Sequence, residues 1–222
     1  MEKLKKINNT TIIEADTADV VSKGDIIKIS LPASNENEIL MFNNGFKLVE
    51  RTIQTDIQVS RVDLNLDKLI RLNMEETTEY KDRIEEIALK SFPYDRRFHL
   101  RINFDDMDLF RSIIKEWIDD LDSVLVAKFK DTVVGFLSLK EITEDTLFVY
   151  LAAVDEKYRL TGAAMSLYSK AVLVARDRGY KTLEGRISTR NSAVMNLYSY
   201  FGAHFENPLD IYLREYDKEN QQ

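Results

Sequence analysis

Residues 151–168 read Leu-Ala-Ala-Val-Asp-Glu-Lys-Tyr-Arg-Leu-Thr-Gly-Ala-Ala-Met-Ser-Leu-Tyr and join the end of an apolar run, a short basic turn and an amphipathic pattern. This order predicts a strand that leads through a tight turn into a helix. The first turn of a helix has backbone N–H groups without intrahelical partners and carries partial positive charge. Because Gly162, Ala163 and Ala164 are small, a pyrophosphate can lie against the backbone there. The stretch therefore predicts an anion-binding turn, although an ordinary strand-to-helix turn has the same pattern.

The composition narrows the classes of function. The chain has 222 residues, enough for one large domain or two modest ones. Its net charge of −7 argues against general nucleic-acid binding, because such proteins present a basic surface to phosphates. The absence of cysteine excludes disulfides, thiolate metal sites and a cysteine nucleophile, and two histidines are too few for a typical histidine-based metal site. No signal peptide and no apolar run of about 18 residues is recognisable. We therefore expect a cytoplasmic protein with no metal and no membrane partner.

The first part of the chain is predicted to form a small α+β unit. Short β-branched runs at 10–16 and 25–31 predict strands, and 46–59 alternates as an extended strand would. Between them, 35–42 predicts a short helix with Asn35 as its N-cap. The polar stretch that follows is the best candidate boundary. We predict an N-terminal domain over 1–66, without a recognisable catalytic constellation, and a larger domain over 67–222.

The larger domain is predicted to combine strands with helices. Strands are expected at 68–72, 124–129, 133–139, 146–154, 181–188 and 205–216, and helices at 75–91, 105–121, 161–178 and 191–201. This order predicts a mixed central sheet with helices on both faces, of the α+β or α/β class.

Two motifs in this order resemble those of GNAT-type N-acetyltransferases. Arg159-x-x-Gly162-x-Ala164 is similar to the family's acetyl-CoA pyrophosphate loop, Gln/Arg-x-x-Gly-x-Gly/Ala. The segment Asn-Ser-Ala-Val-Met-Asn-Leu-Tyr that begins at Asn191, followed by Gly202, resembles the family's segment on the helix after the fifth strand. The resemblance implies the GNAT fold and acetyl-CoA as co-substrate. The chain departs from the pattern at Leu160 and Ala163, where many relatives have further glycines, and at Ala203, where the family has phenylalanine.

A more diffuse resemblance extends over nearly the whole chain to the TDP-fucosamine acetyltransferase group of that family. It rests on the segments 45–50, 88–92, 96–98, 117–118 and 135–140. This resemblance implies that the acceptor is a nucleotide-linked 4-amino-dideoxy sugar.

The family resemblance also implies which residues hold acetyl-CoA. The family pairs the main chain at the end of the fourth strand with pantetheine, while the turn that follows binds the pyrophosphate. Asn191 can cap its helix, contact CoA or do both, and the alanines and valine of the strand are equally typical of a plain core. The residues expected at the CoA site are Ala152, Ala153, Val154, Arg159, Leu160, Thr161, Gly162, Ala163, Ala164 and Asn191.

Acetyl transfer requires a neutral amine and a proton for the departing thiolate. Tyr198 matches the family's general acid, and a phenol with an ordinary pKa near 10 is protonated at neutral pH. A buried core tyrosine is the alternative. The general base stays open among Glu184 with Arg186 beside it, Glu141, Asp155 and water.

The loop 92–104 lies where GNAT enzymes build much of the acceptor site. Arg96 and Arg97 can pair with a diphosphate, and Phe98 can stack on a base or sugar. A solvated turn with anchoring aromatic residues is the alternative. The leading hypothesis is an acetyl-CoA-dependent N-acetyltransferase, for which a homodimer is one option. The alternatives are acetylation of another amine, such as an amino acid, an antibiotic or a protein N-terminus, and a non-catalytic acyl-CoA-binding module.

Overall fold

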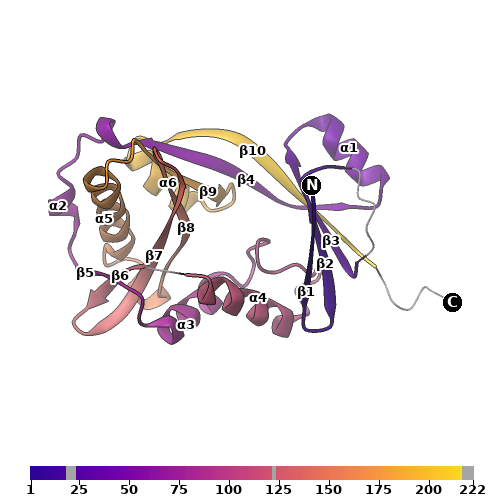
Figure 1. Cartoon of the computed structure of the whole chain (residues 1–222), viewed down its shortest axis with the longest axis horizontal. Helices are drawn as coiled ribbons and strands as arrows, with labels where there is room; N and C mark the ends of the chain where they lie inside the picture. Colours follow the sequence, from indigo (N-terminus) through magenta and orange to yellow (C-terminus); the bar gives the residue numbers. More distant parts are fainter. Residues whose placement is uncertain (19–23, 122–123, 217–222) are drawn as a thin grey trace.

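The computed structural model describes residues 1–18, 24–121 and 124–216. They build one ten-stranded mixed sheet in the order β1-β2-β3-β10-β4-β9-β8-β7-β6-β5 (Figure 1). The pairs β2–β3 and β8–β9 run parallel, and the other neighbouring pairs run antiparallel. The strands are β1 Glu2–Ile7, β2 Thr10–Ala15, β3 Ile26–Pro32, β4 Lys47–Gln58, β5 Asn73–Thr77, β6 Val124–Phe129, β7 Thr132–Thr143, β8 Thr146–Val154, β9 Thr182–Ser188 and β10 His204–Glu215.

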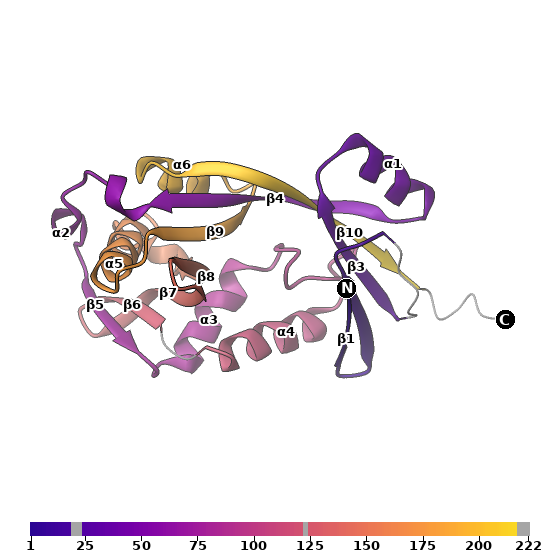
Figure 2. The same cartoon turned by 45° about the horizontal axis from the view of Figure 1, so that its top comes forward.

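Helices cover both faces of this sheet, which confirms the predicted fold class. One hydrophobic cluster joins α3 and α4 to side chains such as Phe136 of β7, while a second cluster joins α5 and α6 to its neighbour Leu137 on the opposite face. Figure 2 shows α3 and α4 together below the strands. The helices are α1 Asn35–Asn43, α2 Leu66–Leu69, α3 Lys81–Ser91, α4 Met107–Asp119, α5 Ala163–Asp177 and α6 Ser192–Tyr200, with 3-10 turns η1 at Val59–Arg61 and η2 at Glu156–Tyr158.

The N-terminal residues have a small core of their own and also complete the main sheet. Met41 of α1 packs with Ile29 of β3 and Tyr212 of β10. β4 lies between β9 and β10, with Thr52 opposite Ser188 on one side and Leu209 on the other. Backbone pairing therefore crosses the predicted boundary at residue 66.

Several predicted element bounds are wrong. The expected strand at 68–72 is occupied by the short α2, and β5 at Asn73–Thr77 falls partly within the expected helix 75–91. β1 was not predicted. Ser34, and not Asn35, is the N-cap of α1, because its side chain accepts the Asn37 N–H.

The two parallel strands in the middle of the sheet separate at their carboxyl ends. β8 and β9 pair from Thr146–Thr182 to Val149–Gly185, and beyond this point each continues without the other. The register of β8 against β7 shifts by one residue at Tyr150, which marks a β-bulge at the point of separation. The backbone of β8 that faces the opening is therefore free to pair with a ligand.

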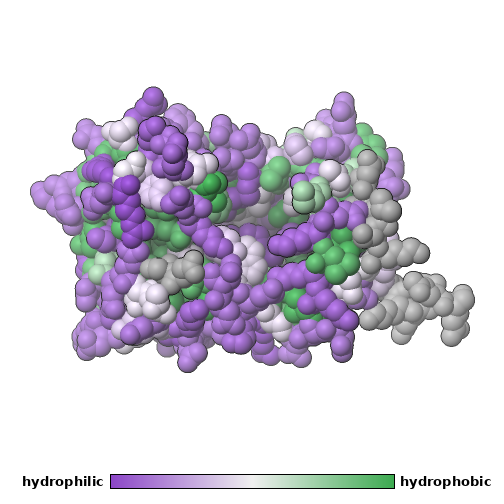
Figure 3. Space-filling model, viewed as in Figure 1, coloured by the Kyte–Doolittle hydropathy of each residue, from purple (hydrophilic) through white to green (hydrophobic). Residues whose placement is uncertain are grey.

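The face in Figure 3 is largely hydrophilic, and hydrophobic side chains appear on it in separate patches. Among the described helices, none is long and apolar enough to cross a membrane.

Candidate active site

A cleft opens where β8 and β9 separate. Its larger part is a cavity of about 620 Å³ between the end of α3, the loop after it and the ends of β4, β8 and β9. A second cavity of about 460 Å³ continues along β8 towards α5. Ala152, Arg159, Tyr168 and Asn191 line both cavities, so the two form one continuous space, which we name the central cleft.

The structure gathers most of the predicted CoA residues at one end of the central cleft. Ala153, Val154 and Ala164 line the narrower cavity together with the shared residues. The side chains of the turn between Val154 and Ala164 have three different environments. Leu160 is fully exposed, the Thr161 hydroxyl donates to the Tyr158 carbonyl at 2.7 Å, and Ala163 is buried in the core.

Gly162 is the N-cap of α5, which begins two residues later than predicted. Its φ of +83° lies in the left-handed region, where a residue with a Cβ is strained. The reason for a glycine that the sequence suggested, close approach of a ligand to the backbone, is thus joined by a conformational one. α5 has 15 residues, so its N-terminus carries the full partial charge expected of a long helix.

Tyr198 lies almost fully buried on α6, and its hydroxyl reaches the last pair before β8 and β9 separate. A Cβ at Gly185 would lie 2.2 Å from that oxygen, so this position has room for glycine alone. The Tyr198 hydroxyl shares hydrogen bonds with Tyr168 and Thr55. Burial raises the pKa of Tyr198, although the hydrogen bonds and the Arg97 cation work against that rise.

Tyr168 is the second phenol at this point. Burial, together with the neighbouring Tyr198, raises the pKa of Tyr168 well above its ordinary value. The ring of Tyr168 meets that of Tyr198 edge to face, with centroids 5.1 Å apart. Of the two phenols, Tyr198 is therefore the better proton donor, since its phenolate has hydrogen-bond partners ready.

Asn191 caps α6. Its side-chain oxygen accepts the Val194 N–H at 3.1 Å, which is one of the two roles expected for it. Because Asn191 also lines the central cleft, its amide group is within reach of a ligand there.

The three residues of the loop 92–104 that were expected to bind the acceptor, Arg96, Arg97 and Phe98, have different surroundings. Arg96 is buried, and its guanidinium donates to the carbonyls of Arg101 at 2.6 Å and Ile102 at 3.2 Å. Phe98 is fully buried and meets Trp117 edge to face at 4.9 Å. Both side chains hold the loop in place and neither lines the cleft, which speaks against the ligand-binding roles that the sequence suggested for them.

Arg97 alone of these three lines the central cleft. Its guanidinium forms a bidentate pair with Asp95, at 2.6 Å from Nη2 to Oδ2 and 3.0 Å from Nε to Oδ1. Burial by itself would raise the pKa of Asp95, but Arg97 outweighs it and lowers that pKa. Arg97 and Tyr150 also line a polar cavity of about 500 Å³ between the β1–β2 hairpin and α4.

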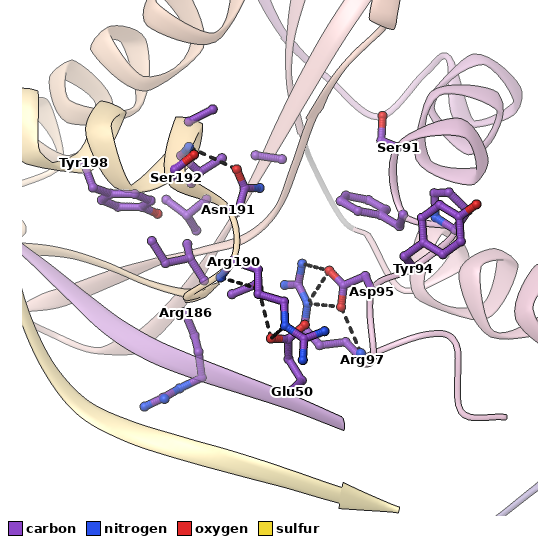
Figure 4. Close-up of a pocket in the computed structure, with 18 of the residues that line it drawn as sticks. Glu50, Ser91, Tyr94, Asp95, Arg97, Arg186, Arg190, Asn191, Ser192 and Tyr198 are labelled. Carbon is purple, nitrogen blue, oxygen red and sulfur yellow. Dashed lines mark hydrogen bonds and ion pairs between the residues drawn. The ribbon is translucent and has the colours of Figure 1, made fainter. Parts of the chain in front are cut away.

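Glu50 is a carboxylate in the cleft that the sequence did not indicate. Glu50 lies in the cleft because β4 pairs with β9. The Ser188 hydroxyl donates to Glu50 Oε1 at 3.0 Å, and the Arg51 N–H donates to the same oxygen at 3.0 Å. Arg190 Nε lies 3.9 Å from Oε1. Glu50 Oε2 forms no hydrogen bond or ion pair with the described part of the chain. Figure 4 shows Glu50, Arg190 and the Asp95–Arg97 pair close together, with Tyr198 across the cleft.

The carboxylates considered as a base from the sequence have other surroundings. Asp155 pairs with Arg83 at 2.5 Å, and although burial raises its pKa, that hydrogen bond brings the pKa below its ordinary value. Glu141 accepts the Tyr180 hydroxyl at 2.5 Å, and Glu184 accepts the Gln54 amide at 3.1 Å. Arg186 borders the cleft, but its guanidinium donates to the Asn207 carbonyl and turns away from the centre (Figure 4).

No group of three or more histidine, cysteine, aspartate or glutamate side chains that could hold a metal ion occurs among the residues placed by the structure.

Solved structures with the same fold were found in several organisms. A functionally unknown conserved protein from Staphylococcus epidermidis ATCC 12228 has a TM-score of 0.61 and 15% identity, covering 94% of this chain and 85% of that one. A putative acetyltransferase of the GNAT family from Novosphingobium aromaticivorans DSM 12444 has a TM-score of 0.57 and 14% identity, covering 88% and 77%. The glucosamine N-acetyltransferase region of a fungal multi-domain GH3 β-N-acetylglucosaminidase has a TM-score of 0.62 and 10% identity, covering 96% of this chain and 31% of that protein.

At this level of identity these likenesses concern the fold. A search of curated proteins gave no match. The sequence profile described as the acetyltransferase (GNAT) family matches residues 81–203, which is more than half of the chain and includes both the turn at Gly162 and the helix of Tyr198. The chain therefore belongs to the acetyltransferase (GNAT) family.

Proposed function

We propose that this protein transfers the acetyl group of acetyl-CoA to the amine of a small acceptor that also carries phosphate, with a nucleotide-linked 4-amino-dideoxy sugar as the first candidate. The observation that carries this proposal is the arrangement of the central cleft. One end has a helix N-terminus with Arg159, and the other end has Glu50, Arg97 and Arg190 together.

The CoA end of the cleft fits a long, anionic, amide-containing molecule. The Gly162 turn offers backbone N–H groups and Arg159 offers a guanidinium to the phosphates. The open edge of β8 from Ala152 to Val154 offers main-chain groups to the amides of pantetheine. This arrangement brings the thioester to the point where the two strands separate, next to the Tyr198 hydroxyl.

Glu50 and Tyr198 divide the proton transfers. Glu50 Oε2 accepts the proton of the acceptor ammonium, directly or through one water, which leaves a neutral amine. The amine nitrogen bonds to the carbonyl carbon of the thioester and gives its second proton to solvent water, and the carbon–sulfur bond breaks, which leaves a neutral amide. Tyr198 gives its hydroxyl proton to the departing thiolate, while Tyr168 and Thr55 stabilise the phenolate that remains until it is reprotonated from solvent.

The acceptor end of the cleft supports an anionic acceptor. Arg97 and Arg190 supply positive charge beside the carboxylate that would hold the amine. An acceptor with an amine and a phosphate group satisfies both signs of charge. A similar fold acts on glucosamine in the fungal protein named above, which is consistent with an amino-sugar acceptor.

A screen of acetyl-CoA consumption over amines tests the proposal. We expect turnover with nucleotide-linked 4-amino-6-deoxyhexoses and much weaker turnover with the free amino sugar, because the free sugar has no phosphate for the arginines. Replacing Arg190 by alanine should raise the KM for the nucleotide sugar about tenfold without changing acetyl-CoA affinity. Turnover restricted to acceptors without phosphate would reject this acceptor class. Tight acetyl-CoA binding without turnover of any amine would favour a non-catalytic binding module.

A further inference from the structure

Arg71 belongs to the connection between α2 and β5, and its backbone is fixed to the first turn of α5. Its N–H donates to the Ser166 hydroxyl oxygen at 3.0 Å. Ser166 is fully buried, and its hydroxyl in turn lies 3.0 Å from the Gly162 carbonyl and 3.4 Å from that of Leu69. A polar anchor of this kind holds Arg71 one helical turn away from the N-cap of α5.

The side chain of Arg71 runs back to that N-cap. Its Cδ lies 3.7 Å from the position that a Cβ on Gly162 would take, and, apart from Gly162 and its two chain neighbours, no other described residue has a heavy atom within 4 Å of that position. The guanidinium begins one bond beyond Cδ. Beyond the chain neighbours of Gly162, the space left open by its missing side chain is therefore bordered by the side chain of Arg71.

The charges around Arg71 call for an anion. Arg71 is exposed and forms no ion pair with the carboxylates that the structure describes. A guanidinium beside the positive end of a helix is repelled by it, unless a negative group lies between the two. The planar fork of an arginine suits two oxygens of a phosphate.

We propose that Arg71 pairs with a phosphate of CoA bound at the Gly162 turn. This proposal rests on the proposed function and adds to it a cofactor-binding residue from outside the family match at 81–203. The turn would then hold the phosphate from two sides, with backbone N–H groups of α5 on one side and the Arg71 guanidinium on the other.

Calorimetric titration of the full-length protein with CoA and with 3′-dephospho-CoA tests this inference. We expect Arg71→Ala to weaken CoA binding about 5- to 20-fold, because one charge-assisted contact at an exposed position is lost. The CoA affinity of Arg71→Lys should lie between those of the parent and of Arg71→Ala, because lysine keeps the positive charge but lacks the planar guanidinium. Arg61→Ala is the matched control. Arg61 is an exposed arginine of η1, near the opposite end of α5 where Arg176 bonds the Val59 carbonyl, and its loss should leave CoA affinity unchanged.

The two ligands identify the phosphate. A loss of affinity with both ligands assigns Arg71 to the diphosphate, and a loss seen with CoA alone assigns it to the 3′-phosphate. Equal CoA affinity in the parent and in Arg71→Ala would overturn the inference while leaving the proposed function intact. A parent protein that binds neither ligand would reject the proposed function and this inference together.

Discussion

Tyr198 combines burial with a hydroxyl that is already hydrogen-bonded at the point where β8 and β9 part. We expect Tyr198→Phe to lower kcat about 10²-fold, because the thiolate then leaves without a proton donor. Acetyl-CoA affinity should stay within about twofold, since phenylalanine keeps the edge-to-face packing against Tyr168. Steady-state kinetics and calorimetry measure the two quantities. Tyr168→Phe, which removes a supporting hydroxyl, should cost less, and a Tyr198→Phe enzyme with full turnover would return this residue to a packing role.

Glu50 gives a second prediction at the scale of single residues. Glu50→Gln keeps the shape and can keep the contacts to Ser188 and Arg51, but it cannot take up a proton. We expect kcat to fall about 10²-fold at neutral pH and to recover partly at higher pH, where more of the acceptor amine is neutral. The pH profile of kcat measures this effect. Glu156→Gln, at another carboxylate that borders the cleft, is the control and should leave the profile unchanged.

The surroundings of His99 give a prediction of how the free energy of unfolding depends on pH. His99 is buried beside Phe104 and Phe110, and neither ring nitrogen forms a hydrogen bond of ordinary geometry with the residues that the structure describes. Burial, and after it the Arg96 cation, lowers the pKa of His99 in the folded protein. In the unfolded chain the imidazole takes up a proton at about pH 6.5, whereas in the folded protein it does so only at lower pH. The contribution of His99 to the free energy of unfolding is therefore complete above about pH 6.5 and falls as the pH is lowered further.

We therefore expect His99→Phe to flatten the dependence of the free energy of unfolding on pH between about pH 7 and 5. Urea unfolding of parent and variant at several pH values measures the difference, which removes the contribution of the carboxylates common to both. His204→Gln, at an exposed histidine, should keep the slope of the parent. Parallel curves for the parent and His99→Phe would contradict the prediction.

The family motifs predicted site residues where a strand, a turn and a helix start follow one another in the sequence. Arg159, Ala164 and Asn191 belong to these motifs, and all three line one cleft in the structure. Glu50 could not be found in this way, because only the pairing of β4 with β9 brings it there. Arg96 and Arg97 are adjacent in sequence and equally basic, so the sequence cannot tell which one the loop turns inward.

At the scale of elements, the turn before α5 makes a prediction about backbone approach. Gly162→Val should abolish measurable CoA binding, because the new side chain fills the space that a phosphate needs and is strained at a φ of +83°. Gly179→Val separates the two effects. Gly179, at the other end of α5, has a φ of +82° and no atom within 4 Å of a Cβ, so it carries the strain without the obstruction.

Calorimetry should find CoA binding retained in Gly179→Val and lost in Gly162→Val, while thermal melting shows a similar loss of stability in both. Equal CoA affinity in the two variants would mean that the phosphates lie elsewhere.

The strands that the sequence missed, β1 and β5, lie at the two edges of the sheet. β5 reads Asn-Met-Glu-Glu-Thr, which has no alternation of apolar and polar residues and carries two glutamates suited to a first helical turn. Pairing with the buried β6 makes it a strand nonetheless. β1 is equally charged and pairs with the apolar β2. In both β1 and β5, pairing with a neighbouring strand sets the conformation, and the residues of the strand itself do not reveal it. The interior strands β6, β7 and β8 were predicted from their own apolar residues.

At the scale of the whole molecule, the predicted boundary at residue 66 leads to a test. A fragment of residues 67–222 would lack β4, which separates β9 from β10 in the sheet. We expect this fragment to show no cooperative thermal transition, because two long rows of backbone groups lose their partners. Deletion of residues 1–16, which removes β1 and β2, should leave a cooperative but lower melting temperature. A 67–222 fragment that melts cooperatively would make the C-terminal part an independent domain.

The position of β4 also concerns the order of events during synthesis of the chain. β4 pairs with β10, so Arg51 has its partner Asp210 at a separation of 159 residues, and the bidentate bond between them cannot form until the last strand exists. The ribosome adds roughly 5–20 residues per second, so about ten seconds or longer pass between the synthesis of β4 and that of β10. Until β9 and β10 have been made, both edges of β4 are unpaired. During that time the nascent strand is open to pairing with other chains, and its charged residues, such as Lys47, Glu50 and Arg51, oppose such association. The central cleft is thereby completed only after β10 has been synthesised, because Glu50 reaches the cleft only when β4 is enclosed between β9 and β10.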